Sequence, residues 1–304
     1  MQIAFDPARL AAATRGFTTR TVPQGAMVAV SAAPAAPRPG DLVLARVVQI
    51  GQHKQLELPT SRKATLFAGD EVILAYGHRY APDQFEAGVP EDLGPCDMVA
   101  AGGVAGRVLA RHAKVGEPTR IEPVGLLVDG SGAVLNLADF AVQPQPTSRR
   151  VPGIAVVGGS MNAGKTTAAA NLVHGLTKAG YRVGAAKITG TGAGNDFWHM
   201  KDAGAVRVLD FTDAGLATTF RADLATIEQA ALTLAAALLE DQVDVIVYEI
   251  ADGLFQDETS ALVKSRILRG LVNGYVYAGE SAASVAAGVQ WLRYASVRDS
   301  RRGG

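Results

Sequence analysis

The sequence predicts two domains of different class: a small β-rich domain, built as a barrel or a sandwich, and an α/β domain with a parallel sheet that follows it. The chain has 304 residues, about twice the usual domain length. Residues 41–142 consist of short β-like runs between glycine, proline and aspartate, whereas strands and helices alternate from Val151 onward. Proline-rich segments at 31–40 and 143–152 mark the boundaries.

These breaks divide the chain into three predicted segments. Residues 1–39 are predicted to form an N-terminal helix and a linker rich in proline and alanine. Residues 40–143 are predicted to form the β-rich domain, and residues 151–298 the α/β domain. Short strands at close spacing favour a compact antiparallel barrel or sandwich for the β-rich part, and its runs lie at 42–48, 71–76, 121–128 and 133–137.

Composition and charge exclude several classes of protein. The 29 basic residues balance 29 acidic ones, so no general attraction to nucleic acid or to an anionic membrane is expected. The single cysteine, Cys96, cannot form an internal disulfide or a cysteine-built metal site, which suits a reducing compartment. No basic segment followed by an apolar one opens the chain, and no apolar run reaches ~18 residues. We therefore expect a cytoplasmic protein with neither a nucleic-acid nor a membrane partner.

Strands and helices alternate through the α/β domain. One predicted helix, at 165–179, ends before Gly180, and another, at 224–240, has Asp223 as its N-cap. This alternation predicts a parallel sheet with right-handed crossovers, in which ligands bind at the carboxyl ends of the strands. The predicted strands lie at 154–158, 182–188, 207–210, 245–250 and 274–278.

A phosphate-binding loop follows the first of these strands. Residues 159–166 fit the pattern G-x-x-x-x-G-K-[ST] between an apolar run and a helix-forming stretch. Its glycines let successive amides close around a polyphosphate, and the next helix adds its positive N-terminal end. Lys165 would contact the outer phosphates, and the Thr166 hydroxyl would hold Mg²⁺. The sequence therefore predicts that ATP or GTP binds with Mg²⁺ at Gly159, Ser160, Met161, Asn162, Ala163, Gly164, Lys165, Thr166 and Thr167.

Two further charged residues are predicted to reach this site. Glu249 lies at the carboxyl end of the strand at 245–250, where it would bind Mg²⁺ directly or through water; the alternative is a surface acid at a strand terminus. Lys187 ends the strand at 182–188, and a lysine beside phosphates is stabilised by them. We expect Lys165, Lys187 and Glu249 to be the catalytic residues.

Several residues after the strand ends are candidates for binding a substrate. The loop at 189–196 contains three glycines, and it either closes over a substrate or is a flexible connector whose Asp196 caps a helix. Asp210 and Asp213 could bind metal or a substrate amine or hydroxyl, although acidic turn residues are more often structural, and Asp252 is equally plausible as a simple turn-former. The candidates are Gly192, Asp196, Asp210, Asp213 and Asp252.

The phosphate loop, the strand ending in Lys187 before a glycine-rich loop, and segment 248–254 together resemble the P-loop class that contains dethiobiotin synthetase, the cobyrinate amidases and the molybdopterin-guanine dinucleotide accessory GTP-binding proteins. The resemblance covers about residues 151–290. It implies a P-loop NTPase domain in which Lys165 and Thr166 hold phosphate and Mg²⁺, Lys187 faces the reacting carboxylate or phosphoryl group, and Glu249 holds Mg²⁺.

The sequence departs from this class at three places. Ile188 replaces the proline that follows the lysine, Ile250 and Asp252 interrupt a glycine-rich turn, and Ser160 stands where many relatives have a second lysine. The chain also resembles the P-loop half of the D-glutamate N-acetyltransferase family, in which a small domain precedes such a loop and acetyl-coenzyme A is the donor.

Three functions are therefore open. The preferred one is an Mg²⁺-dependent enzyme that uses ATP to phosphorylate or activate a small polar substrate, most simply a carboxylate. The second is an accessory module in which ATP or GTP controls how the β-rich domain binds a partner. The third is acyl transfer from coenzyme A, with the loop holding its phosphates. A homodimer is one way to cover the exposed edge of a short sheet.

Overall fold

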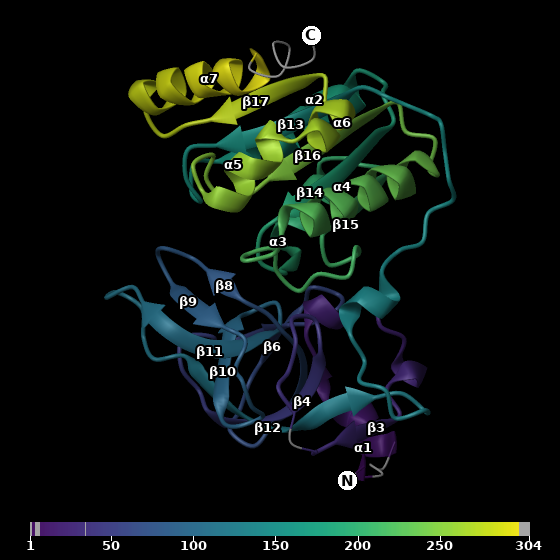
Figure 1. Cartoon of the computed structure of the whole chain (residues 1–304), viewed down its shortest axis with the longest axis vertical. Coiled ribbons are helices and arrows are strands. Elements are labelled where there is room, and N and C mark those ends of the chain that lie inside the picture. Colours follow the sequence, from purple (N-terminus) through teal and green to yellow (C-terminus); the bar gives the residue numbers. More distant parts are fainter. Residues whose placement is uncertain (1, 4–6, 34, 298–304) are drawn as a thin grey trace. The chain divides into compact units, whose positions relative to one another are not determined.

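The computed structural model describes residues 2–3, 7–33 and 35–297. The chain divides into two compact units, each made of discontinuous segments. Unit 1 contains Met1–Ala141, Thr191–Asn195 and Thr212–Phe220, and unit 2 contains the rest. Figure 1 colours the chain along its sequence. Within the described residues, no helix is long and apolar enough to cross a membrane.

Unit 1 is built around a closed β-barrel. Pairing runs from β12 (Thr119–Val128) to β4 (Leu42–Gln49), β7 (Glu71–Tyr76), β11 (Val104–Arg111) and β10 (Cys96–Ala100), which pairs with β12 again. Most of these pairs are antiparallel, but β11 and β7 are parallel. Of the barrel or sandwich that the sequence predicts, the structure shows a barrel, with one parallel junction.

Alternating side chains of β4 serve two cores of unit 1. Val43, Ala45 and Val47 join one apolar cluster, while Leu42 and Leu44 join another that includes Leu10 of α1 (Pro7–Ala12). This period of two lets one strand bury both faces. Cys96 lies in the first cluster, and burial raises the pKa of its thiol to about 12, so it is an inert core residue.

Short elements complete unit 1. Residues 1–39 contribute strands as well as the predicted helix and linker: β3 (Ala29–Ser31) pairs with β12, and β2 (Thr14–Arg15) pairs with β7. The predicted strand at 133–137 is reduced to isolated bridges at Val134 and Asn136. The remaining strands are β1 (Gln2–Ile3), β5 (Gln55–Glu57), β6 (Lys63–Thr65), β8 (Arg79–Tyr80) and β9 (Phe85–Gly88), and the 3₁₀ turns are Phe17–Thr19, Gln24–Ala26 and Leu137–Phe140.

Unit 2 is an α/β domain with a parallel sheet of the kind found in P-loop NTPases, as the sequence predicts. Its strand order is β15-β14-β16-β13-β17, and every pair that links these strands is parallel. Parallel strands require crossovers, which the helices supply. The strands are β13 (Gly153–Gly158), β14 (Val183–Thr189), β15 (Arg207–Asp210), β16 (Val245–Ile250) and β17 (Gly274–Ala278).

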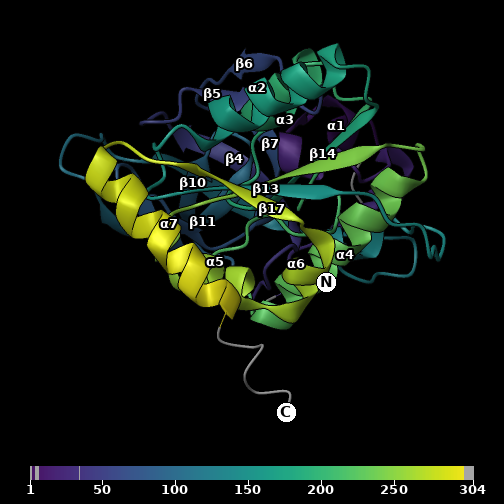
Figure 2. The same cartoon turned by 90° about the horizontal axis from the view of Figure 1, so that it is seen from above.

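Helices cover both faces of this sheet. Figure 2 shows α2 (Lys165–Lys178) and α4 (Leu224–Leu239) on opposite faces. Val156, Val173 and Val247 form part of the core beneath α2. α4 begins after Asp223, whose carboxylate accepts the Thr226 amide at 2.8 Å, as the sequence predicts. The other helices are α3 (Gly194–Asp202), α5 (Asp257–Lys264), α6 (Arg266–Leu271) and α7 (Ala282–Val297).

Candidate nucleotide site

The phosphate loop connects β13 to α2 at the carboxyl edge of the sheet. Gly164, the residue before α2, has a φ of 89°, which glycine adopts without steric cost. At Gly159 a Cβ atom would lie 2.6 Å from the Ser284 Oγ and 2.8 Å from the Tyr277 hydroxyl. The backbone conformation thus favours glycine at position 164, whereas a side chain at position 159 would displace the ends of the Ser284 and Tyr277 side chains.

The loop exposes donors that suit an anion. Among the described residues, none supplies a hydrogen-bond acceptor to the amides of Ser160, Met161 or Gly164. Backbone N–H groups without acceptors, in a turn that leads into a helix, form an anion-binding concavity. This arrangement fits a polyphosphate.

Lys165 lies at the first position of α2 and is buried. Its ammonium group donates to the Ser160 carbonyl at 2.6 Å and to the Met161 carbonyl at 3.2 Å. Burial lowers the pKa of Lys165, and the carboxylates of Asp252 and Glu249 oppose that effect. Carbonyl oxygens fix the ammonium without neutralising its charge, so a phosphate would gain from contact with it.

Thr166 and Glu249 form the second part of the site. The Thr166 hydroxyl donates to Glu249 Oε1 at 2.8 Å, which links α2 to the carboxyl end of β16. The other carboxylate oxygen, Oε2, is buried without a hydrogen-bond partner. Burial raises the pKa of Glu249, although the positive charge of Lys187 works in the other direction.

These two side chains fit Mg²⁺. A hydroxyl and a carboxylate are oxygen donors of the kind this ion prefers, and a cation would satisfy the orphaned Oε2. Within the described ranges, no group of three histidine, cysteine, aspartate or glutamate side chains could bind a metal ion by itself.

Lys187 reaches the same edge of the sheet from β14. Its buried ammonium forms an ion pair with Asp196, at the start of α3. Burial alone would lower the pKa of Lys187, but the negative charges of Asp196, Glu249 and Asp210 outweigh it and the pKa rises. The charged form of Lys187 is therefore favoured at this edge of the sheet, where Asp196 holds it.

The turn after β16 packs on the phosphate loop. A Cβ atom on Gly253 would lie 2.8 Å from the Gly159 carbonyl oxygen, and the Leu254 amide donates to the Gly158 carbonyl at 2.8 Å. Asp252 precedes this glycine, and burial raises the pKa of its carboxyl group while Lys165 opposes the shift. Asp252 thus lies beside the phosphate loop, and its role in substrate binding stays a prediction.

The candidate residues separate into two groups. Unit 2 brings together Lys165, Thr166, Lys187 and Glu249 with three of the substrate candidates: Asp196, Asp210 and Asp252. Gly192 and Asp213 belong to unit 1, where Gly192 packs close to Thr18 and Asp213 forms an ion pair with Arg20 at 2.6 Å. Their contacts hold unit 1 together, and a role in substrate binding stays a prediction.

Three residues next to the phosphate loop were not predicted from the sequence. The Ser160 hydroxyl contacts the Glu280 carboxylate, and the Tyr277 hydroxyl lies 3.3 Å from the Ser284 hydroxyl. Tyr277 lies on β17, Glu280 lies between β17 and α7, and Ser284 lies at the start of α7. The sequence did offer one indication of their position, because they lie at and after the end of the last predicted strand. The carboxyl ends of parallel strands share one edge of the sheet, where the phosphate loop also lies.

Part of the chain matches a known protein family. Residues 154–261 match the family model of molybdopterin guanine dinucleotide synthesis protein B. Unit 2 thus combines a parallel sheet and a phosphate loop of the kind that P-loop NTPases have. The match covers the phosphate loop, Lys187 and Glu249, and it ends before β17. No curated protein matches the sequence significantly.

Solved structures similar to the chain include proteins of the signal recognition particle system. The receptor FtsY from Elizabethkingia anophelis has a TM-score of 0.36 at 15% identity, covering 50% of this chain and 49% of that one. The 54 kDa protein from Aeropyrum pernix K1, in complex with GDP, has a TM-score of 0.31 at 20% identity, covering 46% and 32%. This chain thus spans half or less of their lengths.

Proposed function

We propose that this protein binds a nucleoside triphosphate with Mg²⁺ at the phosphate loop and transfers the terminal phosphoryl group to a small substrate that carries a carboxylate. The observation that supports this most strongly is the Thr166–Glu249 pair beside the loop, because one buried oxygen of the carboxylate lacks a partner. Oxygen donors with unused capacity beside free amides are what a metal-bound triphosphate requires.

Each residue of the site then has a defined task. The amides of the loop hold the β- and γ-phosphates, and Lys165 spreads its charge over them. Bound Mg²⁺ would neutralise developing charge on the phosphoryl oxygens, with Thr166 and Glu249 as its protein ligands. Phosphoryl transfer depends mainly on positioning and electrostatics, so no nucleophile from the protein is required.

Lys187 is the residue that favours an acidic substrate. Its charge lies at the edge of the sheet beside Glu249, and it is balanced by Asp196. An incoming carboxylate would share this ammonium with Asp196 and be held towards the γ-phosphate. The charge of Asp252 works against the lowering of the Lys165 pKa by burial, and the charge of Asp210 helps to raise the pKa of Lys187. Their negative charges would disfavour substrates with an additional anionic group.

Steady-state turnover tests this proposal. ADP or GDP release is measured with ATP or GTP, with and without Mg²⁺, across a panel of small mono- and dicarboxylic acids. Lys187→Ala should lower acid-stimulated turnover at least about tenfold and change nucleotide Kd by less than about threefold. The matched control is Lys178→Ala, an exposed lysine at the end of α2. Acid-stimulated turnover that Lys187→Ala leaves unchanged would contradict the assignment.

A second candidate is a nucleotide-controlled accessory module, favoured by one feature of the chain path. The segments that follow β14 and β15, Thr191–Asn195 and Thr212–Phe220, fold as part of unit 1. If the ends of β14 and β15 moved when a γ-phosphate bound, the movement would therefore reach segments that belong to unit 1. Slow hydrolysis stimulated by a protein and by no small acid would favour this function. Binding of coenzyme A without nucleotide hydrolysis would instead favour acyl transfer.

A further inference from the structure

A cavity of about 500 Å³ lies in unit 2, away from the phosphate loop. Its walls come from the connector at 147–151, the second half of α4, the start of β16, and α6. The connector leads into the first residue of β13, so the cavity is at the amino edge of the parallel sheet. Cavities of this size hold small organic ligands.

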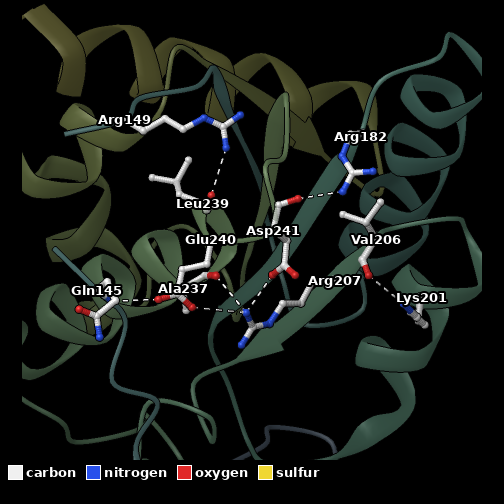
Figure 3. A network of polar contacts seen from close by, with 10 residues as sticks. All are labelled: Gln145, Arg149, Arg182, Lys201, Val206, Arg207, Ala237, Leu239, Glu240 and Asp241. Atoms are coloured by element: carbon white, nitrogen blue, oxygen red, sulfur yellow. Dashed lines mark hydrogen bonds and ion pairs between the residues drawn. The ribbon is translucent and has the colours of Figure 1, made fainter. Parts of the chain in front are cut away.

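The connector that forms one wall is held in place by hydrogen bonds. Figure 3 shows Arg149 and Gln145 reaching the end of α4. The Arg149 guanidinium donates to the Leu239 carbonyl at 3.1 Å and to the Val243 carbonyl at 2.6 Å, and the Gln145 amide donates to the Glu240 carboxylate at 2.8 Å. The wall is thus fixed by the fold.

The inner surface of the cavity is mostly apolar. Leu232, Ala236 and Leu239 of α4 and Ile246 of β16 line it, and Tyr248 adds an aromatic ring. Tyr248 is 1% exposed, and burial raises the pKa of its hydroxyl, so the ring is uncharged. Apolar side chains around an aromatic ring suit an alkyl or aryl group.

The rim of the cavity is cationic. Arg149, Arg150 and Arg266 line it, and none of the lining residues, all within the described part of the chain, is acidic. The guanidinium of Arg149 is held by carbonyl oxygens, which leave its positive charge uncancelled. Three arginines over an apolar floor attract a ligand with a negative head and an apolar body.

We propose that this cavity binds an amphipathic carboxylate, with its alkyl or aryl body against α4 and its carboxylate at the arginine-lined rim. The site shares no residue with the phosphate loop or with the Thr166–Glu249 pair. It is therefore independent of the proposed nucleotide chemistry, and its ligand is not the phosphoryl acceptor.

Calorimetric titration of the full chain with decanoate tests the chemistry of the ligand. Decanoate should bind with a stoichiometry of one, and 1-decanol and decyltrimethylammonium, which have the same alkyl chain, should bind at least about tenfold more weakly. Equal affinity for the alcohol or the cation would overturn the proposal, as would absence of decanoate binding.

Two variants place the ligand in the cavity. Arg150→Glu reverses a charge of the rim and should weaken decanoate binding at least about tenfold. Gly270→Leu, on α6, should weaken decanoate binding to a similar extent, because the added side chain fills part of the cavity. The leucine can be accommodated, since no atom lies within 4 Å of an added Cβ.

Matched controls lie elsewhere in the described chain. Arg293→Glu makes the same charge change on α7, and Gly175→Leu adds the same side chain on α2, where an added Cβ also meets no atom within 4 Å. Thermal melts establish that each variant is folded. Weaker binding in Arg150→Glu and Gly270→Leu with intact binding in the controls supports the site. Equal effects in variants and controls, or none in any, would overturn it.

Discussion

At the scale of a single residue, the surroundings of Glu249 shift the pKa of its carboxyl group in opposite directions. Its carboxylate is buried at the end of β16, which raises the pKa, while Lys187 and Lys165 favour the charged form. One oxygen accepts from Thr166 and the other has no partner. A carboxylate held in this way costs free energy in the native state, and such costs are concentrated at functional sites.

His53 of unit 1 predicts a pH dependence of stability. Its Nδ1 lies 3.2 Å from the Met98 carbonyl, and burial, joined by the positive charge of Arg79, lowers its pKa to about 4. In the unfolded chain the pKa is about 6.5, so as the pH falls between these values the unfolded state takes up a proton that the native state does not. Stability should therefore fall as the pH falls, by at most about 3 kcal/mol.

Urea unfolding at about pH 7.5 and about pH 5 measures this effect. His53→Gln should lose less stability between the two pH values than the wild type does. His174→Gln, at an exposed position of α2, is the control and should behave as the wild type. An unchanged pH dependence in His53→Gln would mean that another group titrates.

At the scale of elements, α6 shows how a short helix depends on its cap. It has six residues, and the Ser265 side chain accepts the Leu268 amide at 3.0 Å. So short a helix is unstable alone, and its first amides need acceptors. Ser265→Ala should lower the free energy of unfolding by about 1 kcal/mol, or Tm by roughly 2–4 °C. Ser265→Asp keeps an acceptor and should retain more stability; a thermal melt in which both variants behave alike would argue against capping.

The elements that sequence patterns predicted share a physical signal. β13, β16 and α4 are apolar runs with clear ends. The phosphate loop is recognised by the spacing of its glycines, and its pattern requires a strand before it and a helix after it. The turn that places Lys187 beside Asp196 could be expected only as a strand end followed by a loop. α5 and α6 were not predicted, because helices of eight and six residues carry little periodicity.

The short strands and the late segments of unit 1 could not be predicted for a different reason. Strands such as β2 and β3 have two or three residues and exist because β7 and β12 pair with them, which no local pattern reveals. The membership of Gly192 and Asp213 in unit 1 depends on contacts far apart in the sequence. The alternation of strands and helices predicts that these two residues follow strand ends, but it does not predict which unit they join.

At the scale of the whole molecule, the chain completes unit 1 with segments taken from the second half of the sequence. The Gly194 amide donates to the buried Glu57 carboxylate at 3.0 Å, and Arg20 pairs with Asp213 at 2.6 Å. The side chains of that ion pair are 13% and 10% exposed. Unit 1 therefore includes residues up to Phe220.

Breaking this ion pair should be costly. Arg20→Ala leaves the Asp213 carboxylate without its counter-charge in a buried place, and we expect a loss of about 3 kcal/mol. Asp213→Ala in the same background removes the stranded charge, so the double variant should be more stable than the sum of the single effects implies. Equilibrium unfolding in urea measures all three variants, and strictly additive losses would show that the two residues act independently.

Binding of nucleotide at the phosphate loop is tested most directly by calorimetric titration of ATP and GTP, with Mg²⁺ and with a chelator, into wild type, Lys165→Ala and Glu249→Gln. We expect one nucleotide to bind the wild type, Lys165→Ala to weaken binding at least about a hundredfold, and Glu249→Gln to abolish the gain in affinity that Mg²⁺ provides. Binding that survives Lys165→Ala unchanged, or no binding of either nucleotide by the wild type, would contradict the assignment.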